Sequence, residues 1–282
     1  MKLSILSSEF DRFPLEKQFE MVASLGFDGI ELSGIRPYAY APDMDQSRIE
    51  RILTLKERYH LEIPLYSPEL LRYPYNISSP NERERRDTIA YLKRAVEVAK
   101  AVGARGTQIT CGHAGYDTDR HENFRHMVEV LKEVSAHAEE TGIDLFLKPL
   151  TIMESNTIVM IDSAVELIQA VNSHRLKAML DSTIVMTNWE SLDGYFEKLG
   201  NLLSYIHWGT STGTAEEHLK NSANHMDDAF SFFAKIRQRG YDGWVGIKMS
   251  SDYIRESEMH ASREHRQLRE IFAHFDRQED DL

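Results

Sequence analysis

The chain has 282 residues, of which 41% are hydrophobic and 10% aromatic, a composition that excludes an intrinsically disordered protein. Its 45 acidic residues outnumber the 33 basic ones, and the net charge of -12 argues against a general surface for nucleic acid or an anionic membrane. Its single cysteine, Cys111, excludes an internal disulfide and favours a reducing compartment.

Short apolar runs rich in β-branched or aromatic residues alternate along the chain with longer segments of helical periodicity. The first run starts at Lys2 without the features of a signal peptide, and no run approaches the ~20 apolar residues that span a membrane, so we expect a cytoplasmic protein. The expected strands, in chain order, are residues 3–7, 29–33, 63–67, 106–110, 144–149, 177–182, 203–209 and 244–250. Helices are expected at residues 15–25, 82–102, 123–140 and 226–239, among others.

A glycine follows several of the expected helices, as at Gly26, Gly103, Gly142 and Gly240, where it supplies a left-handed C-cap before the next strand. A doubly wound open sheet would show similar alternation. Eight β-then-α units, without a Gly-x-Gly-x-x-Gly motif after the first strand, instead favour a (β/α)8 TIM barrel. We expect one domain over residues 1–282, with 276–282 as a frayed tail.

In such a barrel the catalytic groups lie at the carboxyl ends of the strands and in the loops that follow. Lys148 and Lys248 are isolated cations that end apolar strands, and Asp181 and His207 occupy equivalent places on the strands between them. A buried ammonium requires a partner, so we expect the lysines to meet Asp181 in a shared site. The alternative is that each lysine extends past its strand end into solvent.

Further polar residues follow other strands and are candidates for binding a substrate. The candidates are Arg36, Glu69, His113, Tyr116 and Glu154. Glu31, in the second strand, is a further polar residue near a strand end. His113 stands in a loop of small residues that leaves room for a ligand, although it could equally hold backbone groups of that loop. Glu154 could bind a sugar hydroxyl or cap the following turn. Both alternatives remain open.

These residues, in this order, resemble the xylose-isomerase-like barrel enzymes, and among them the fructoselysine 3-epimerase type. Segments that carry the resemblance include Gly29-Ile30-Glu31, Tyr66-Ser67-Pro68-Glu69, Tyr73-Pro74-Tyr75-Asn76, His113-Ala114-Gly115-Tyr116 and Glu154-Ser155-Asn156. The resemblance implies a xylose-isomerase-like TIM barrel and a sugar isomerase or epimerase.

The resemblance also implies a divalent metal held at four strand ends by Glu, Asp, His and Glu. Asp181 and His207 occupy two of these positions, but Lys148 and Lys248 stand where the two glutamates would be. The family's acidic group two residues after the histidine is replaced by Gly209, and its Pro-Gly-x-Gly loop is absent near residues 221–224. We therefore expect no cofactor, the family's Mn²⁺, Mg²⁺ or Co²⁺ being lost.

Two hypotheses follow. The first is a metal-free isomerase or epimerase of ketose or fructosamine-like sugars, in which Lys148, Lys248, Asp181 and His207 are catalytic and one lysine acts as a base or forms a Schiff base. The second is a catalytically inactive barrel that binds a sugar or an anion and has a regulatory role. In either case the expected partner is a small sugar or sugar derivative, with a homo-oligomer possible and no nucleic acid or membrane.

Overall fold

The computed structural model describes residues 1–209, 225–249 and 256–280. Its strands are β1 (Lys2–Leu6), β2 (Gly29–Gly34), β3 (Leu65–Pro68), β4 (Gly106–Thr110), β5 (Asp144–Lys148), β6 (Leu176–Asp181), β7 (Leu203–Gly209) and β8 (Trp244–Lys248). Within the described residues these eight strands are parallel and close into a barrel in chain order, with β8 paired to β1. The predicted (β/α)8 barrel is confirmed.

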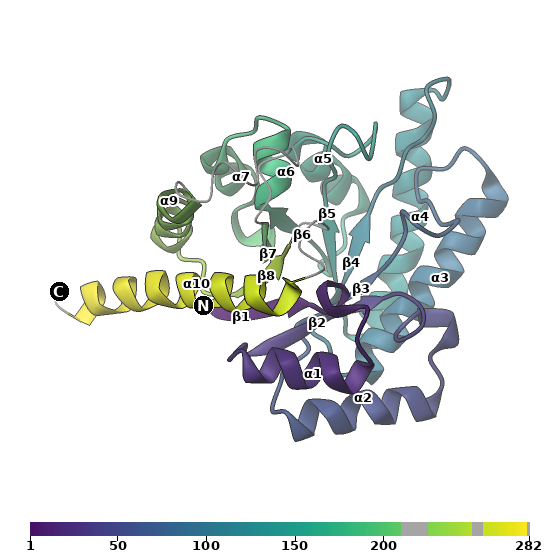
Figure 1. Cartoon of the computed structure of the whole chain (residues 1–282). Helices are drawn as coiled ribbons and strands as arrows, with labels where there is room; N and C mark the ends of the chain where they lie inside the picture. The colour runs from purple at the N-terminus through teal and green to yellow at the C-terminus, as the bar shows by residue number, and fades with distance from the viewer. Residues whose placement is uncertain (210–224, 250–255, 281–282) are drawn as a thin grey trace.

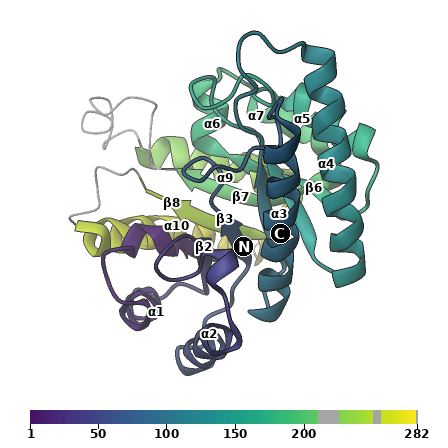
Figure 2. The ribbon, with the colours of Figure 1, turned by 90° about the vertical axis from the view of Figure 1, so that its right-hand side faces the viewer.

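Helices surround the barrel and connect its strands (Figure 1). They are α1 (Leu15–Ser24), α2 (Gln46–Arg58), α3 (Glu82–Ala101), α4 (Arg120–Thr141), α5 (Ile161–Val171), α6 (Ser182–Thr187), α7 (Leu192–Leu199), α9 (His225–Gln238) and α10 (Ser257–Asp280). Short 3-10 helices are η1 (Ser7–Phe10), η2 (Ala41–Asp43) and η3 (Gly200–Leu202). Figure 2 shows α3 and α4 side by side along one flank of the barrel. No helix in the described part of the chain is long and apolar enough to cross a membrane.

The strands are buried on both faces, because side chains fill the barrel on one side and helices cover the other. Every residue of β2 is buried, and the core includes Leu3, Ile30, Leu147 and Ile247. Helix α4 presents its apolar face to this core and ends at Gly142, whose φ of 80° provides the left-handed cap that the sequence predicts. Apolar packing between strands and helices therefore holds the strand ends in fixed positions.

The C-terminal helix α10 runs as far as Asp280 and projects beyond the barrel in Figure 1. Its Asp276 forms an ion pair with Arg237 of α9, with 2.7 Å between Oδ1 and Nη1. Residues 276–280, for which the sequence predicts fraying, therefore continue the helix, and residues 281–282 lie outside the described part.

Candidate active site

A cavity of about 470 Å³ opens at the carboxyl ends of the strands. Its wall includes Lys148 at the end of β5 and Lys248 at the end of β8, together with Glu69 and Glu154 from loops. This is the face on which TIM barrels place their reacting groups, because each strand end and the loop after it converge there. Residues 210–224, which follow β7, and residues 250–255, which follow β8, lie outside the described part of the chain, and so does the segment near 221–224 where the sequence predicts that the family's loop is replaced.

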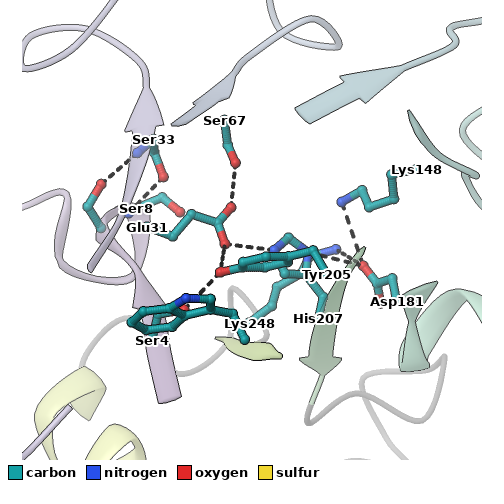
Figure 3. A network of polar contacts seen from close by, with 12 residues as sticks. Ser4, Ser8, Glu31, Ser33, Ser67, Lys148, Asp181, Tyr205, His207 and Lys248 are labelled. Atoms are coloured by element: carbon teal, nitrogen blue, oxygen red, sulfur yellow. Dashed lines mark hydrogen bonds and ion pairs between the residues drawn. The ribbon is translucent and has the colours of Figure 1, made fainter. Parts of the chain in front are cut away.

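The two lysines approach the same carboxylate oxygen (Figure 3). Lys148 Nζ lies 3.6 Å from Asp181 Oδ2, and Lys248 Nζ lies 3.3 Å from that atom. The side chain of Asp181 is fully buried, that of Lys148 is 8% exposed and that of Lys248 is 36% exposed. His207 adds a third contact, with Nδ1 3.8 Å from Asp181 Oδ2. The structure thus brings together the four residues that the sequence selects at the ends of β5 to β8.

The environment gives these ionisable groups different proton affinities. Burial, together with the neighbouring Lys248, lowers the pKa of Lys148 below its ordinary value. Asp181 instead raises the pKa of Lys248. Burial disfavours ionisation of Asp181, but the charges of Lys248 and Lys148 and contact with His207 outweigh it and hold its pKa well below the usual range. At neutral pH the site therefore joins a cation at Lys248, an anion at Asp181 and a less basic amine at Lys148.

A second buried network lies beside the lysines and centres on Glu31 of β2. His207 Nε2 donates to Glu31 Oε2 at 2.8 Å, and the Tyr205 hydroxyl donates to the same oxygen at 3.2 Å. Ser67 donates to Glu31 Oε1, and Ser4 bonds to the Tyr205 hydroxyl at 2.8 Å. Contact with His207 and Ser67 outweighs burial and lowers the pKa of Glu31, which is therefore a carboxylate. The network orients the His207 ring, so that Nδ1 faces Asp181.

Two glycines leave space for these contacts. A Cβ at Gly246 would lie 2.9 Å from the Tyr205 hydroxyl and 3.0 Å from Glu31 Oε2, closer than packed side chains allow. A Cβ at Gly209 would overlap the hydroxyl of Thr183 at the start of α6. The close approach of α6 to β7 therefore leaves no room for a larger residue than glycine at position 209.

The donor set around Asp181 does not match the requirements of a divalent cation. Such ions require several neutral or anionic donors, whereas Asp181 Oδ2 is shared by two ammonium groups and His207 Nε2 is bonded to Glu31. Among the described residues, no group of three or more His, Cys, Asp or Glu is placed to hold a metal ion. The residues at the four strand ends are thus suited to ion pairs of Asp181 with Lys148 and with Lys248.

Three residues that the sequence assigns to substrate binding do not line this cavity. The Arg36 guanidinium donates to Asp43 at 2.6 and 2.8 Å and lies over the ring of Tyr40. The His113 ring contacts Tyr116 edge to face, with 4.8 Å between ring centroids, and the Tyr116 side chain is 90% exposed. Their roles in substrate binding remain predictions.

The other two predicted binding residues, Glu69 and Glu154, do line the cavity. Glu154 Oε2 accepts hydrogen bonds from the amide and hydroxyl of Thr151, at 3.1 and 2.8 Å. Glu69 Oε1 accepts from the amides of Leu71 and Arg72, at 2.8 and 3.2 Å. Each carboxylate thus stabilises its own loop, and this capping is compatible with a second contact to a ligand.

The sequence places Glu31 among the polar residues near strand ends without assigning it a role, and it does not mark Tyr205, Glu9 or Gln108. Glu31 and Tyr205 form the network around His207, and Glu9 and Gln108 line the cavity. Tyr205 precedes His207 by two residues on β7, so strand alternation was a usable signal for their common direction. No local signal marks Glu9 or Gln108, because their place in the cavity depends on closure of the barrel.

Comparison with known proteins shows the family and the fold of the chain. The chain is 33% identical to the fructoselysine 3-epimerase of Shigella flexneri over 261 residues, which cover 93% of this chain and 94% of the relative. It is 27% identical to the D-psicose 3-epimerase of Ruminiclostridium cellulolyticum over 198 residues, covering 67% and 64% of the two chains. A solved D-tagatose 3-epimerase-like protein has the same fold, with a TM-score of 0.81 and 21% identity over 99% of each chain. A family model described as xylose isomerase-like TIM barrel matches residues 19–274. The chain therefore belongs to the xylose isomerase-like TIM barrel family.

Proposed function

We propose that this protein is an epimerase or isomerase of ketose or fructosamine-like sugars whose centre uses two lysines in place of a divalent metal. The observation that carries the proposal is the shared contact of Lys148 and Lys248 with Asp181 Oδ2 beside the cavity. The relatives named fructoselysine 3-epimerase and D-psicose 3-epimerase support the sugar class. The contacts of the Asp181 carboxylate with Lys148 and Lys248 support a centre without a metal ion.

Charge repulsion is the physical reason for excluding a dication. At ~4 Å and an effective dielectric constant of ~20, each pair of unit charges interacts with ~4 kcal/mol. A divalent ion carries two charges, so each protonated lysine would repel an ion bound to Asp181 and His207 with about twice this energy. The ammonium groups also supply positive charge of their own, which can polarise a carbonyl oxygen.

The two lysines are suited to different tasks. Lys248, whose pKa is raised by Asp181, stays protonated and can stabilise the oxyanion that forms when a carbon beside a carbonyl loses its proton. Lys148, whose pKa is lowered by burial, is the better base for removing that proton. Pairs of groups whose pKa values are pushed apart in this way are typical of acid–base sites.

Sugar hydroxyls would meet polar side chains elsewhere in the cavity. Glu69 and Glu154 line it, as do Thr110 and Gln108. The buried Gln108 Oε1 has no hydrogen-bond partner among the described residues, and an unpaired buried acceptor is energetically costly. A ligand hydroxyl that donates a hydrogen bond to this oxygen would remove that cost.

The test is turnover by chelator-treated protein. Ketohexoses and fructosamines are incubated with wild type and with Lys148→Met and Lys248→Met, and products are followed by NMR, with borohydride added to trap a Schiff base. We expect turnover in wild type without added metal and its loss in both variants. Thermal stabilisation by sugars without product or adduct would instead indicate a binding barrel and contradict the proposal.

A further inference from the structure

Glu9 is a buried carboxyl group that the proposed function leaves unused. It lies in η1, directly after β1, has 9% of its surface exposed and lines the cavity. Its Oε1 accepts a hydrogen bond from the amide of Met249 at 3.1 Å, which ties it to the residue after Lys248. Its other oxygen has no partner in the described part of the chain.

The other deeply buried carboxylates of the site are occupied. Glu31 accepts from Ser67 at one oxygen and from His207 at the other. Asp181 accepts from the amide of Thr183 at one oxygen and contacts the lysines with the other. As far as the described residues go, Glu9 therefore keeps one oxygen available for a ligand, which neither of these carboxylates does.

The position of Glu9 relative to Lys148 follows from the order of the strands. β1 and β5 are four strands apart in either direction around the closed barrel, so their ends lie on opposite sides of its axis. Glu9 and Lys148 both line the cavity of about 470 Å³ between these ends. A substrate held there would have one of these groups on each side.

We propose that Glu9 and Lys148 form a two-base pair that inverts a carbon next to the substrate carbonyl, one group acting on each face. The proposal rests on the proposed function and assigns it an epimerisation. Inversion requires a proton to leave one face and another to arrive at the opposite face, which a single rigid base cannot do.

In the reaction, Lys148 in its unprotonated form takes the proton from the carbon beside the carbonyl. The electrons of the broken C–H bond form the C=C bond of an enediolate, and its oxyanion is stabilised by the Lys248 ammonium. The Glu9 carboxyl group then gives its proton to the opposite face of the same carbon. The C=C electrons form the new C–H bond, and the carbonyl is restored. Lys148 ends protonated and Glu9 ionised, and proton exchange with solvent resets both; the reverse reaction uses them in opposite roles.

Glu9 also has the protonation behaviour that this role requires. Burial raises its pKa to about 8, against the smaller opposing effects of the Met249 amide and Lys248. At neutral pH the group therefore carries a proton that it can deliver, and its conjugate base is strong enough to remove one in the reverse direction.

The test follows proton exchange and inversion separately in D2O. Wild type, Glu9→Gln and Lys148→Met are incubated with each epimer of the pairs D-fructose/D-psicose and D-tagatose/D-sorbose, and with the corresponding fructosamines, and followed by NMR. Glu9→Gln should slow inversion at least ~100-fold but still exchange deuterium into one epimer. Lys148→Met should likewise lose inversion and exchange deuterium only into the opposite epimer. Glu20→Gln, on the exposed side of α1, is the matched control and should behave as wild type.

The outcomes separate the two proposals. If wild type inverts a ketose and folded Glu9→Gln inverts it within about threefold of the same rate, the assignment of Glu9 is overturned while the proposed function stands. If both variants lose exchange from the same epimer, the opposite-face arrangement is overturned. If wild type neither exchanges nor inverts any member of the panel, the proposed function is overturned, and the role of Glu9 with it.

Discussion

Replacing Asp181 by asparagine should destabilise the protein by about 3 kcal/mol, because it leaves two lysines without their anion. Asparagine keeps the size of the side chain and can still accept from the Thr183 amide, which lies 3.1 Å from Asp181 Oδ1. The substitution therefore removes charge and little else. The free energy of unfolding, measured with denaturant at neutral pH, gives the change directly.

The magnitude follows from the burial of the partners. Removing one member of a buried ion pair typically costs ~3–5 kcal/mol. The Lys148 side chain is 8% exposed and should experience this penalty, whereas Lys248 is 36% exposed and is partly screened by water. Lys148 can also lose its proton in the variant, which limits the penalty, so the lower end of the range is expected.

The effect should depend on pH in a defined direction. The pKa of Asp181 is depressed in the folded protein, so its contribution to stability is present above the unfolded pKa of about 4 and is lost as pH falls through the folded value. The pKa of Lys248 is raised, so its contribution is lost at alkaline pH as the lysine deprotonates. The difference between wild type and variant should therefore be largest near neutrality.

A matched control separates burial from charge. Asp193 also contacts two cations, Lys235 at 3.1 Å and Arg239 at 3.4 Å, but its side chain is 45% exposed. Asp193→Asn should change stability little, because water screens an exposed pair. A change below ~0.5 kcal/mol for Asp181→Asn as well would refute the reasoning, because it would mean that the two lysines are solvated and independent of Asp181.

Two further predictions concern the same centre. The protein as purified should contain no stoichiometric Mn²⁺, Zn²⁺ or Co²⁺ by elemental analysis, and a metal that survives dialysis but is absent from Asp181→Asn would contradict this. Gly246→Ala should destabilise the fold by ~1–3 kcal/mol in chemical denaturation, because the added Cβ would lie 2.9 Å from the Tyr205 hydroxyl. An unchanged denaturation midpoint would show that the side chains around Glu31 can move to accommodate the methyl group.

Much of the barrel could be predicted because its signals are local. The strand predicted at residues 106–110 and the glycine C-cap at Gly142 coincide with the structure, since each depends on an apolar run or a turn that a few residues define. Boundaries shift by one to three residues elsewhere: β3 begins at Leu65 where position 63 was expected, and α4 begins at Arg120 where position 123 was expected.

The site could be predicted only where a polar residue ends an apolar strand. Lys148, Asp181 and Lys248 have this signature, and barrel topology places such ends together. The bond between Glu31 and His207 joins residues 176 positions apart, and no local pattern pairs them. The cation–carboxylate pair of Arg36 and Asp43, which holds Arg36 away from the cavity, depends likewise on loop geometry that composition does not define.

If Lys148 and Lys248 stand in place of metal-binding carboxylates, the double variant Lys148→Glu with Lys248→Glu should bind a divalent metal. The substitutions replace two positive charges by two negative ones around Asp181 and His207, whose backbones the barrel already fixes. Calorimetric titration with Mn²⁺ compares wild type, both single variants, the double variant and the double variant carrying Asp181→Asn. We expect stoichiometric binding by the double variant, much weaker binding by the single variants because one ammonium still repels the ion, and none by wild type or the Asp181→Asn control. A well-folded double variant that binds Mn²⁺ no better than wild type would show that these four strand-end positions do not form a metal site when they carry Glu, Asp, His and Glu.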